Sequence, residues 1–569
     1  MLDLVIRGAT VIDGTGREPL RGDVGVRDGR IAAVGAVAEE ARATVDAGGL
    51  TLAPGFVDLH THYDAQITWD PTLSPSPSLG VTTAVMGNCG FGIVPAPPAA
   101  RDLIMRNLSV VEGMDLDALR AGIDWRFESF ADYLGAVARQ GPYLNLATFI
   151  GHSVVRTAVM SEAASERRQP TPEELARMRA IVGAAMADGA VGFASSYSPS
   201  HTGFGGVPMP STITEPAELD ALIGAMGDGA GVVQIASGAK PVEEMAALAG
   251  RHGRAIFLTT SVAMFNARAP ERAIGHFAAA AAAQARGENV HIQIPCQPLT
   301  FDFTLANAYP FHSHDSFGAI KGYTREQLMA TYRDQSFRAR FRANLASLKP
   351  GALFHGNWEH MIVGETALPR NAGLTGRSVR DIAAERGGDP LDLAFDLGLE
   401  ENLETGFLGH FLNVGDEGVG RLLRHPAGVV SLSDAGAHLI YMCDAGYGLH
   451  FLARWVRELG VFDLAEGVRR LTSHPADLYG IAGRGRIVTG AAADLLLFDP
   501  ATVGITPPER IGDLPGGGRR TIRRPRGVHG VWVNGVRVFD GTDYVTQARG
   551  PGEVLRRFAR SQAQLARHH

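Results

Sequence analysis

The sequence predicts an α/β protein in which a (β/α)₈ barrel carries a small β-sandwich made from both ends of the chain. Two observations lead to this fold class. Short strand patterns with turn signals fill residues 1–54 and return over residues 481–545, whereas strands and helices alternate between them. Regular alternation favours a parallel sheet covered by helices, and a length of 569 residues suits more than one domain.

The two ends of the chain share the same pattern of short strands and turns. Residues 1–54 and residues 481–545 contain short β-like runs that are separated by dipeptides typical of hairpins. Those dipeptides are Asp13-Gly14, Asp28-Gly29 and Asn534-Gly535. We therefore expect both parts to join in one β-sandwich, and we expect residues 546–569 to form an exposed helical tail.

The middle of the chain, residues 55–480, is predicted to form the barrel. Its strand candidates are residues 81–86, 144–150, 190–193, 232–235, 255–258, 290–294 and 429–432. Its helical patterns include residues 130–140, 172–188, 215–226, 242–252 and 270–287. Thr171 is suited to cap the second of these helices. A doubly wound open sheet is the alternative, but no glycine-rich dinucleotide fingerprint follows the first strand.

Composition excludes several classes of function. Hydrophobic residues make up 45% and charged residues 20% of the chain, as in ordinary globular proteins. The formal net charge is −7 and the sequence has no basic stripe, so nucleic-acid binding is not expected. The three cysteines are too few for a disulfide framework. The sequence shows no secretory signal pattern and no membrane-spanning apolar run. A cytoplasmic protein, either a monomer or a homo-oligomer, is therefore expected.

A metal site is predicted where the first barrel strand ends. The stretch APGFVDLHTH at residues 53–62 fits a buried strand that ends in two histidines, His60 and His62. Alternate residues of a strand point to the same face, so the two imidazoles can hold one divalent ion together. The alternative is that the two histidines lie near a strand end by chance and have no role in metal binding.

Two further residues at strand ends complete a ligand set. Cys89 lies in the glycine-rich turn at residues 87–92, and its thiolate would be a strong zinc ligand, although a lone cysteine is often inert and buried. Asp434 follows the late strand at residues 429–432. Its carboxylate can bind a metal through one oxygen and accept a proton from water through the other, whereas its alternative role is a helix cap.

Four other residues are candidates for substrate contact. They are His152, Arg156, His201 and His438. His152 follows the third strand and could also be a ligand or a packed core histidine. Arg156 could hold a substrate carboxylate through a bidentate contact, and His201 lies in a loop rich in glycine and proline. His438 lies four residues after Asp434.

Together these segments resemble the amidohydrolase superfamily, and within it the N-acyl-D-amino-acid deacylase (D-aminoacylase) branch. The resemblance covers nearly the whole chain. It is carried by APGFVDLHTHYD at residues 53–64, GNCG at 87–90, GHS at 151–153, SDAGAH at 433–438, TSHPA at 472–476 and GRIV at 485–488. It implies a metal-dependent (β/α)₈ barrel with a terminal β-sandwich, and it implies hydrolysis of an amide bond.

The chain departs from that branch at one metal position. The branch is expected to bring one histidine from each of the fifth and sixth strands, but the corresponding segments here are QIASG at residues 234–238 and LTTS at residues 258–261. The other position keeps His60, His62, Cys89 and Asp434. We therefore predict one metal ion, zinc, with room for a water molecule.

The predicted activity is hydrolysis of a linear amide, most simply of an N-acyl-D-amino acid with a free carboxylate, with Asp434 as general base and acid. A cyclic amide, a small peptide or a carbamate is the alternative substrate. A degenerate family member that acts only in binding or assembly is the second alternative. Four histidines after the sixth strand have open roles, with solvated loop positions favoured for the first two. They are His312, His314, His355 and His360.

Overall fold

A computed structural model gives the arrangement of the chain and describes residues 1–166, 169–259, 263–347, 352–439 and 443–560. It divides into two compact units. The first comprises Met1–Met264, Ala269–Cys296 and Glu417–His569, and the second comprises Phe265–Arg268 and Gln297–Asp416. Of the helices in the described part of the chain, none combines the length and apolar character needed to cross a bilayer.

The centre of the first unit is an eight-stranded parallel sheet. Its strands are β6 (Phe56–Asp58), β7 (Val81–Met86), β8 (Asn145–Gly151), β9 (Gly192–Ser196), β10 (Val232–Ala236), β11 (Ile256–Leu258), β12 (Val290–Ile294) and β16 (Gly428–Val430). They lie side by side in strict chain order. A doubly wound sheet would reverse its order at a switch point, so this alternative is wrong.

The sheet curls so that the segments after its two edge strands meet. The Asp434 N–H donates to the His60 carbonyl at 3.2 Å, and the His62 N–H donates to the Ala435 carbonyl at 2.7 Å. Every residue of these eight strands is buried. Because the carboxyl ends of parallel strands share one edge, this junction brings polar residues from distant parts of the chain together.

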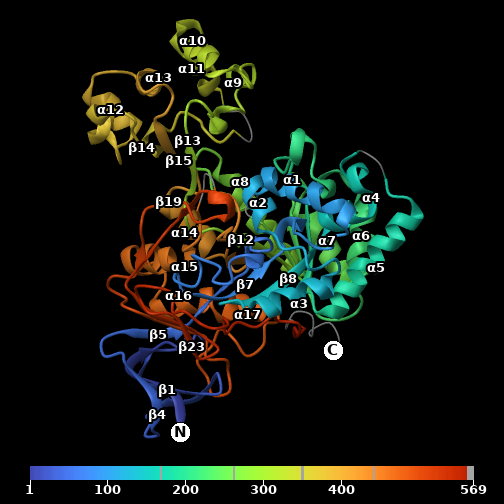
Figure 1. Ribbon diagram of the computed structural model, residues 1–569. Coiled ribbons are helices and arrows are strands. Elements are labelled where there is room, and N and C mark those ends of the chain that lie inside the picture. The colour runs from blue at the N-terminus through green and yellow to red at the C-terminus, as the bar shows by residue number, and fades with distance from the viewer. Residues whose placement is uncertain (167–168, 260–262, 348–351, 440–442, 561–569) are drawn as a thin grey trace. The chain divides into compact units, whose positions relative to one another are not determined.

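Helices separate most of these strands in the chain, and several of them lie around the strands in Figure 1. They are α1 (Arg101–Val111), α2 (Leu116–Gly122), α3 (Phe130–Gln140), α4 (His152–Met160), α5 (Pro172–Asp188), α6 (Pro216–Gly224), α7 (Val242–His252), α8 (Pro270–Ala285), α14 (Asp416–Leu423), α15 (Tyr447–His450), α16 (Leu464–Leu471) and α17 (Ser473–Leu478). Helix α5 begins as predicted. Thr171 accepts from the Glu174 N–H at 3.2 Å while Glu174 accepts from the Thr171 N–H at 2.8 Å, which forms a capping box.

Strands from both termini share a second sheet of the first unit. They are β1 (Leu2–Val11), β2 (Leu20–Arg27), β3 (Arg30–Gly35), β4 (Ala41–Asp46), β5 (Thr51–Pro54), β17 (Leu495–Phe498), β22 (Val528–Val533) and β23 (Val536–Phe539). Asp28-Gly29 and Asn534-Gly535 close hairpins as predicted. Asp13-Gly14 also lies in a hairpin connection, between the antiparallel strands β1 and β2, but this connection covers residues 12–19 rather than two residues. Two small ribbons complete this unit, β18 (Gly504–Ile505) with β21 (Pro525–Arg526) and β19 (Glu509–Ile511) with β20 (Arg520–Ile522).

The expected helical tail is wrong over its described part. Residues 546–560 contain no helix. The segment is instead extended along the first unit, where the Leu146 N–H donates to the Glu553 carbonyl and the Leu555 N–H donates to the Leu146 carbonyl, each at 2.8 Å. Backbone pairing with β8 therefore replaces the hydrogen bonds that a helix would have supplied.

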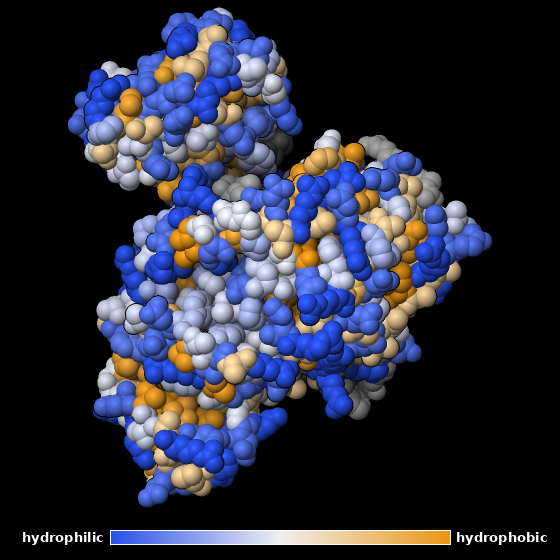
Figure 2. Space-filling model, in the orientation of Figure 1, coloured by the Kyte–Doolittle hydropathy of each residue, from blue (hydrophilic) through white to orange (hydrophobic). Residues whose placement is uncertain are grey.

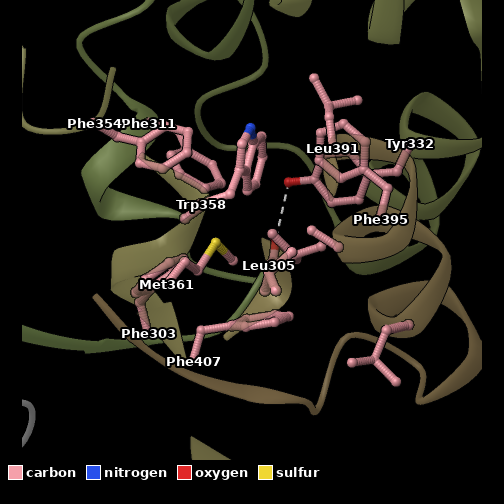
Figure 3. Packing of buried hydrophobic residues seen from close by; sticks show 14 of the residues in the cluster. Phe303, Leu305, Phe311, Tyr332, Phe354, Trp358, Met361, Leu391, Phe395 and Phe407 are labelled. Atoms are coloured by element: carbon pink, nitrogen blue, oxygen red, sulfur yellow. Dashed lines mark hydrogen bonds between the residues drawn. The ribbon is translucent and has the colours of Figure 1, made fainter. Parts of the chain in front are cut away.

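The second unit has a core of its own inside the stretch that the sequence analysis assigned to the barrel. Its elements are β13 (Leu299–Phe303), β14 (Met361–Glu365), β15 (Gly406–Leu412), α9 (Asp315–Gly318), α10 (Arg325–Arg333), α11 (Gln335–Ala346), α12 (Val379–Glu385) and α13 (Pro390–Glu400). Figure 3 shows its aromatic side chains packed together, with the Tyr332 hydroxyl donating to the Leu305 carbonyl at 2.8 Å. Aromatic pairs of this kind stabilise a small core beyond their buried area.

The open histidines lie in this second unit. The interpretation of His314 as a solvated loop residue is wrong, because the side chain is buried and its Nε2 lies 2.7 Å from the Phe354 carbonyl. His355 is also buried, whereas His312 and His360 are half-buried.

Across the face shown in Figure 2, hydrophilic residues predominate and hydrophobic residues form scattered patches.

Candidate metal centre

Three predicted ligands converge at the carboxyl edge of the parallel sheet. His60 and His62 follow β6, and Cys89 lies in the turn after β7. All three side chains are buried, and their ligand atoms lie within 4.8 Å of one another. This is the one such group of at least three potential ligands found in the described ranges.

Asp434 places a carboxylate beside the two histidines of this group. Its Oδ1 lies 3.3 Å from His60 Nε2 and 3.4 Å from His62 Nε2, and Cys89 Sγ lies 3.5 Å from His60 Nε2. With Zn–N and Zn–O bonds of about 2.0–2.2 Å and a Zn–S bond of about 2.3 Å, a tetrahedron has N···O edges of about 3.4 Å and N···S edges of about 3.5 Å. Three of the six edges of such a tetrahedron are therefore matched, while the group in which all ligand atoms lie within 4.8 Å of one another consists of His60, His62 and Cys89 without Asp434.

Local backbone geometry aims the thiol and the carboxylate at this point. Cys89 has a φ of +57° and Asp434 has a φ of +46°, in the left-handed region that side chains rarely adopt. Gly90 follows with a φ of +81°, and a Cβ there would lie 2.9 Å from the Ala194 carbonyl oxygen. The Asn-Cys-Gly turn therefore needs glycine so that Cys89 can approach β9 and the histidines.

Both histidines use their second ring nitrogen on a fixed acceptor. His60 Nδ1 lies 2.9 Å from Gln293 Oε1, and His62 Nδ1 lies 3.2 Å from Glu112 Oε1. With Nδ1 occupied in this way, Nε2 of each ring faces the other donors. Such outer contacts commonly orient metal-binding histidines.

Burial and mutual charge shift the pKa values of the donors. Burial lowers the pKa of His60 to about 4 and raises the pKa of the Cys89 thiol to about 11. Burial opposes the charged form of Asp434, but the charge of His60 and the hydrogen bond from His62 hold the pKa of its carboxyl well below its usual range. Without a cation the thiol therefore keeps its proton at neutral pH, and metal binding must displace it.

Other carboxyl groups nearby make the site strongly electronegative once ionised. Burial raises the pKa of Asp58 and of Glu112 to about 7, and that of Asp64 to about 6. In the described structure the carboxylate of Glu112 is paired with histidines rather than with lysine or arginine. A divalent cation would stabilise the ionised form of all three carboxyl groups.

Two of the candidate substrate-contact residues lie at this site. His438 Nε2 is 4.0 Å from Asp434 Oδ2 and 4.0 Å from Glu112 Oε2. His201 follows β9, where its Nδ1 lies 2.7 Å from Ser196 Oγ. Burial, followed by the charge of His438, lowers the pKa of His201 to about 3, so this ring is neutral beside the ligands.

The other two candidates lie in a separate buried network. His152 Nε2 is 3.0 Å from Glu218 Oε1, its Nδ1 is 2.9 Å from Ser195 Oγ, and Arg156 pairs with Glu218 Oε2 through Nη1. Arg156 is only 1% exposed and also donates from Nε to the Ala164 carbonyl at 2.9 Å. The charge of Arg156 is thus compensated within the protein, and a substrate carboxylate would have to displace Glu218 to reach it.

Three residues of the site were missed by sequence reasoning. Glu112 follows α1, Gln293 lies in β12, and Gln234 in β10 accepts from the Cys89 N–H through its Oε1. A signal existed for the two glutamines, because a polar amide inside a buried strand must satisfy its hydrogen bonds there. Glu112 carried no comparable signal, since a glutamate at a helix end is usually solvated.

Comparison with known proteins agrees with this arrangement. The amidohydrolase family profile matches residues 43–539. D-aminoacylase of Alcaligenes xylosoxydans xylosoxydans is 30% identical over 98% of this chain and 98% of its own, and N-acyl-D-aspartate deacylase of the same organism is 30% identical over 97% and 95%. The crystal structure of N-acyl-D-glutamate deacylase from Bordetella bronchiseptica with zinc and a phosphonate inhibitor has a TM-score of 0.63 at 27% identity, covering 98% of this chain and 100% of that chain.

The protein belongs to the amidohydrolase family. It is a metal-dependent hydrolase that acts on carbon–nitrogen bonds other than peptide bonds. Within the family it lies in the D-aminoacylase-like branch, together with the two relatives and the solved structure named above.

Proposed function

We propose that this protein removes the acyl group from a small N-acyl-D-amino acid, using one zinc ion held by His60, His62, Cys89 and Asp434. The observation that carries the proposal is the match between donor separations of 3.3, 3.4 and 3.5 Å and three of the six edges of a zinc tetrahedron. Two imidazoles, one thiolate and one carboxylate are also ligand types that zinc prefers.

The residues of the fifth and sixth strands, where a second ion would need histidine ligands, favour a single ion. Gln234 lies in β10 and accepts from the Cys89 N–H, and Thr259 follows β11. Neither is a histidine, and residues Thr260 and Ser261, which belong to the same expected position, lie outside the described residues. An amide and a hydroxyl are weak zinc ligands, so the described residues at these two strand ends offer a second ion no donor set comparable to the first.

When bound, zinc would lower the pKa of an attacking water and polarise the amide carbonyl. Asp434 is placed to move the proton. Its Oδ1 faces the two histidines, while its Oδ2 faces His438 at 4.0 Å. We assign Oδ2 as the atom that takes the proton from the water and delivers it to the leaving nitrogen.

Relatives support the class of substrate. The D-aminoacylase and N-acyl-D-aspartate deacylase of Alcaligenes each align over nearly the whole chain. We infer an N-acyl-D-amino acid with a free carboxylate as the substrate. His201 and His438 are the predicted substrate contacts that lie at the metal centre, whereas His152 and Arg156 would contribute by supporting the fold beside β8 and β9.

We extend the proposal to the fold of the chain. We infer that the curled parallel sheet is the metal-binding (β/α)₈ barrel of residues 55–480, with the second unit inserted in it. We infer further that residues 1–54 and 481–545 form a β-sandwich. A cytoplasmic location and the option of a homo-oligomer stay predictions from the sequence.

Metal analysis and a substrate panel test the proposal. Protein purified without added metal should hold close to one equivalent of zinc and should hydrolyse N-acyl-D-amino acids faster than their L-enantiomers. A metal content near two equivalents would contradict the single site. Turnover confined to a cyclic amide, a small peptide or a carbamate would transfer the assignment to that substrate. Neither metal nor turnover would indicate a binding protein.

A further inference from the structure

The two metal-binding histidines are held by acceptors of different charge. His60 Nδ1 contacts the neutral amide oxygen of Gln293 at 2.9 Å, whereas His62 Nδ1 contacts the carboxyl oxygen of Glu112 at 3.2 Å. An ionised carboxylate accepts hydrogen bonds and donates none, so the proton of a neutral His62 must lie on Nδ1. Its Nε2, which donates to the Asp434 carboxylate while no ion is bound, would lose that proton on metal binding and would then offer a lone pair to the ion.

Glu112 reaches this position from a helix end that is far from His62 in the chain. It is the residue after α1, where its N–H donates to the Leu108 carbonyl at 3.0 Å. Its own carbonyl accepts from the His438 N–H. Backbone contacts on both sides therefore fix where its side chain starts, and the residue is only 2% exposed.

The carboxylate of Glu112 is costly to bury unless a positive centre compensates for it. Its described ion-pair partners are His62 and His438, at 3.2 and 4.0 Å. A buried carboxylate without a fixed cation destabilises a fold by several kcal/mol. Such a group is compensated when a cation binds nearby, and the four-donor cluster, which consists of His60, His62, Cys89 and Asp434, is the site where a cation would bind.

We propose that Glu112 is a positioning residue that holds His62 in the metal-binding tautomer and raises the affinity of the site for zinc. The proposal rests on the proposed function, because it needs an ion in the four-donor cluster. The negative charge increases the basicity of the His62 ring, while hydrogen bonding fixes the ring plane. Oε2 of the same carboxylate faces His438, which in turn faces Oδ2 of Asp434.

Two substitutions separate charge from shape. Glu112→Ala removes the acceptor altogether. Glu112→Gln keeps the length and can still accept from Nδ1, but it carries no charge. Glu218→Gln is the matched control, because Glu218 is a buried carboxylate paired at 3.0 Å with the buried ring of His152, which is not a proposed ligand.

The readout is the zinc dissociation constant of the full chain, measured by competition with a chromogenic chelator. We expect Glu112→Ala to weaken zinc binding about 10- to 100-fold, Glu112→Gln to weaken it less, and Glu218→Gln to leave it unchanged. The visible spectrum of the cobalt-substituted protein should shift in the two Glu112 variants alone, since it reports the ligand field.

Each outcome discriminates between the hypotheses. Unaltered zinc affinity in both Glu112 variants overturns the positioning role, even if their melting temperatures fall, because the residue then serves only the fold. Equal losses in the Glu112 and Glu218 variants overturn it as well. If the wild-type protein itself binds no zinc, the proposed metal centre fails and this inference fails with it.

Discussion

Replacing Gly436 by alanine should disturb the proposed metal centre, although Gly436 is not one of the proposed ligands. Gly436 lies two residues after Asp434 and has a φ of +93°. A Cβ at this position would lie 2.6 Å from the His62 carbonyl oxygen and 2.9 Å from the Tyr63 nitrogen. Both atoms belong to the backbone that carries the ligand histidine, so relief of the clash must move the two ligand segments apart.

The size of the effect follows from two contributions. A non-glycine residue at positive φ costs about 1 kcal/mol. Atoms in ordinary contact are about 3.5 Å apart, so the segments must separate by nearly 1 Å, and overpacking of this kind costs about 1–3 kcal/mol. A displacement above about 0.5 Å exceeds what a preorganised site tolerates. We therefore expect about 2–4 kcal/mol of lost stability and a loss of about 100-fold in turnover.

Gly490 provides the control for backbone strain. It has a φ of +90°, but an added Cβ would meet no atom within 4 Å. Gly490→Ala should therefore lose about 1 kcal/mol and leave the zinc site intact. Calorimetric melting and zinc titration of both variants measure the two contributions. If Gly436→Ala melts like Gly490→Ala and binds zinc with wild-type affinity, the reasoning about the junction between the two ligand segments is refuted.

Two further substitutions test the chemistry and the fold separately. Asp434→Asn keeps the shape of the side chain but cannot accept a proton as a carboxylate does, so we expect kcat to fall about 10²- to 10⁴-fold while zinc binding is reduced but measurable. A kcat equal to that of the wild type would rule out the proton-transfer role. Thr171→Ala removes the cap at the start of α5 and should cost about 1 kcal/mol of stability with no change in zinc affinity. An unaltered melting temperature would show that this capping box contributes little.

Features that depend on neighbouring residues could be predicted from the sequence. The helix at residues 172–188 and its cap at Thr171 are confirmed, because capping chemistry acts over a few residues. The proximity of His60, His62 and Cys89, and of Asp434 to the two histidines, was also predictable, because each follows a strand and strand ends of a parallel sheet share one edge. Their role as metal ligands stays a prediction.

Features that depend on which partner a side chain finds could not be predicted. Arg156 follows a strand whether it faces a substrate or Glu218, and only the folded chain shows the internal pair. Glu112 reaches His62 from a helix end without any motif. The aromatic residues of the second unit, such as Phe317 and Phe395, have ordinary amphipathic spacing, which does not reveal that they build a core of their own.

The way the second unit is joined to the chain has an evolutionary consequence. Its entering strand β13 and its leaving strand β15 are antiparallel neighbours, with Leu299 opposite Leu412, and Asn413 donates to the Gln297 carbonyl at 2.8 Å. An insertion whose entrance and exit are paired can be lengthened, shortened or exchanged without stretching the flanking chain. Related enzymes could therefore acquire different segments at this point while the residues of the proposed metal centre stay in place.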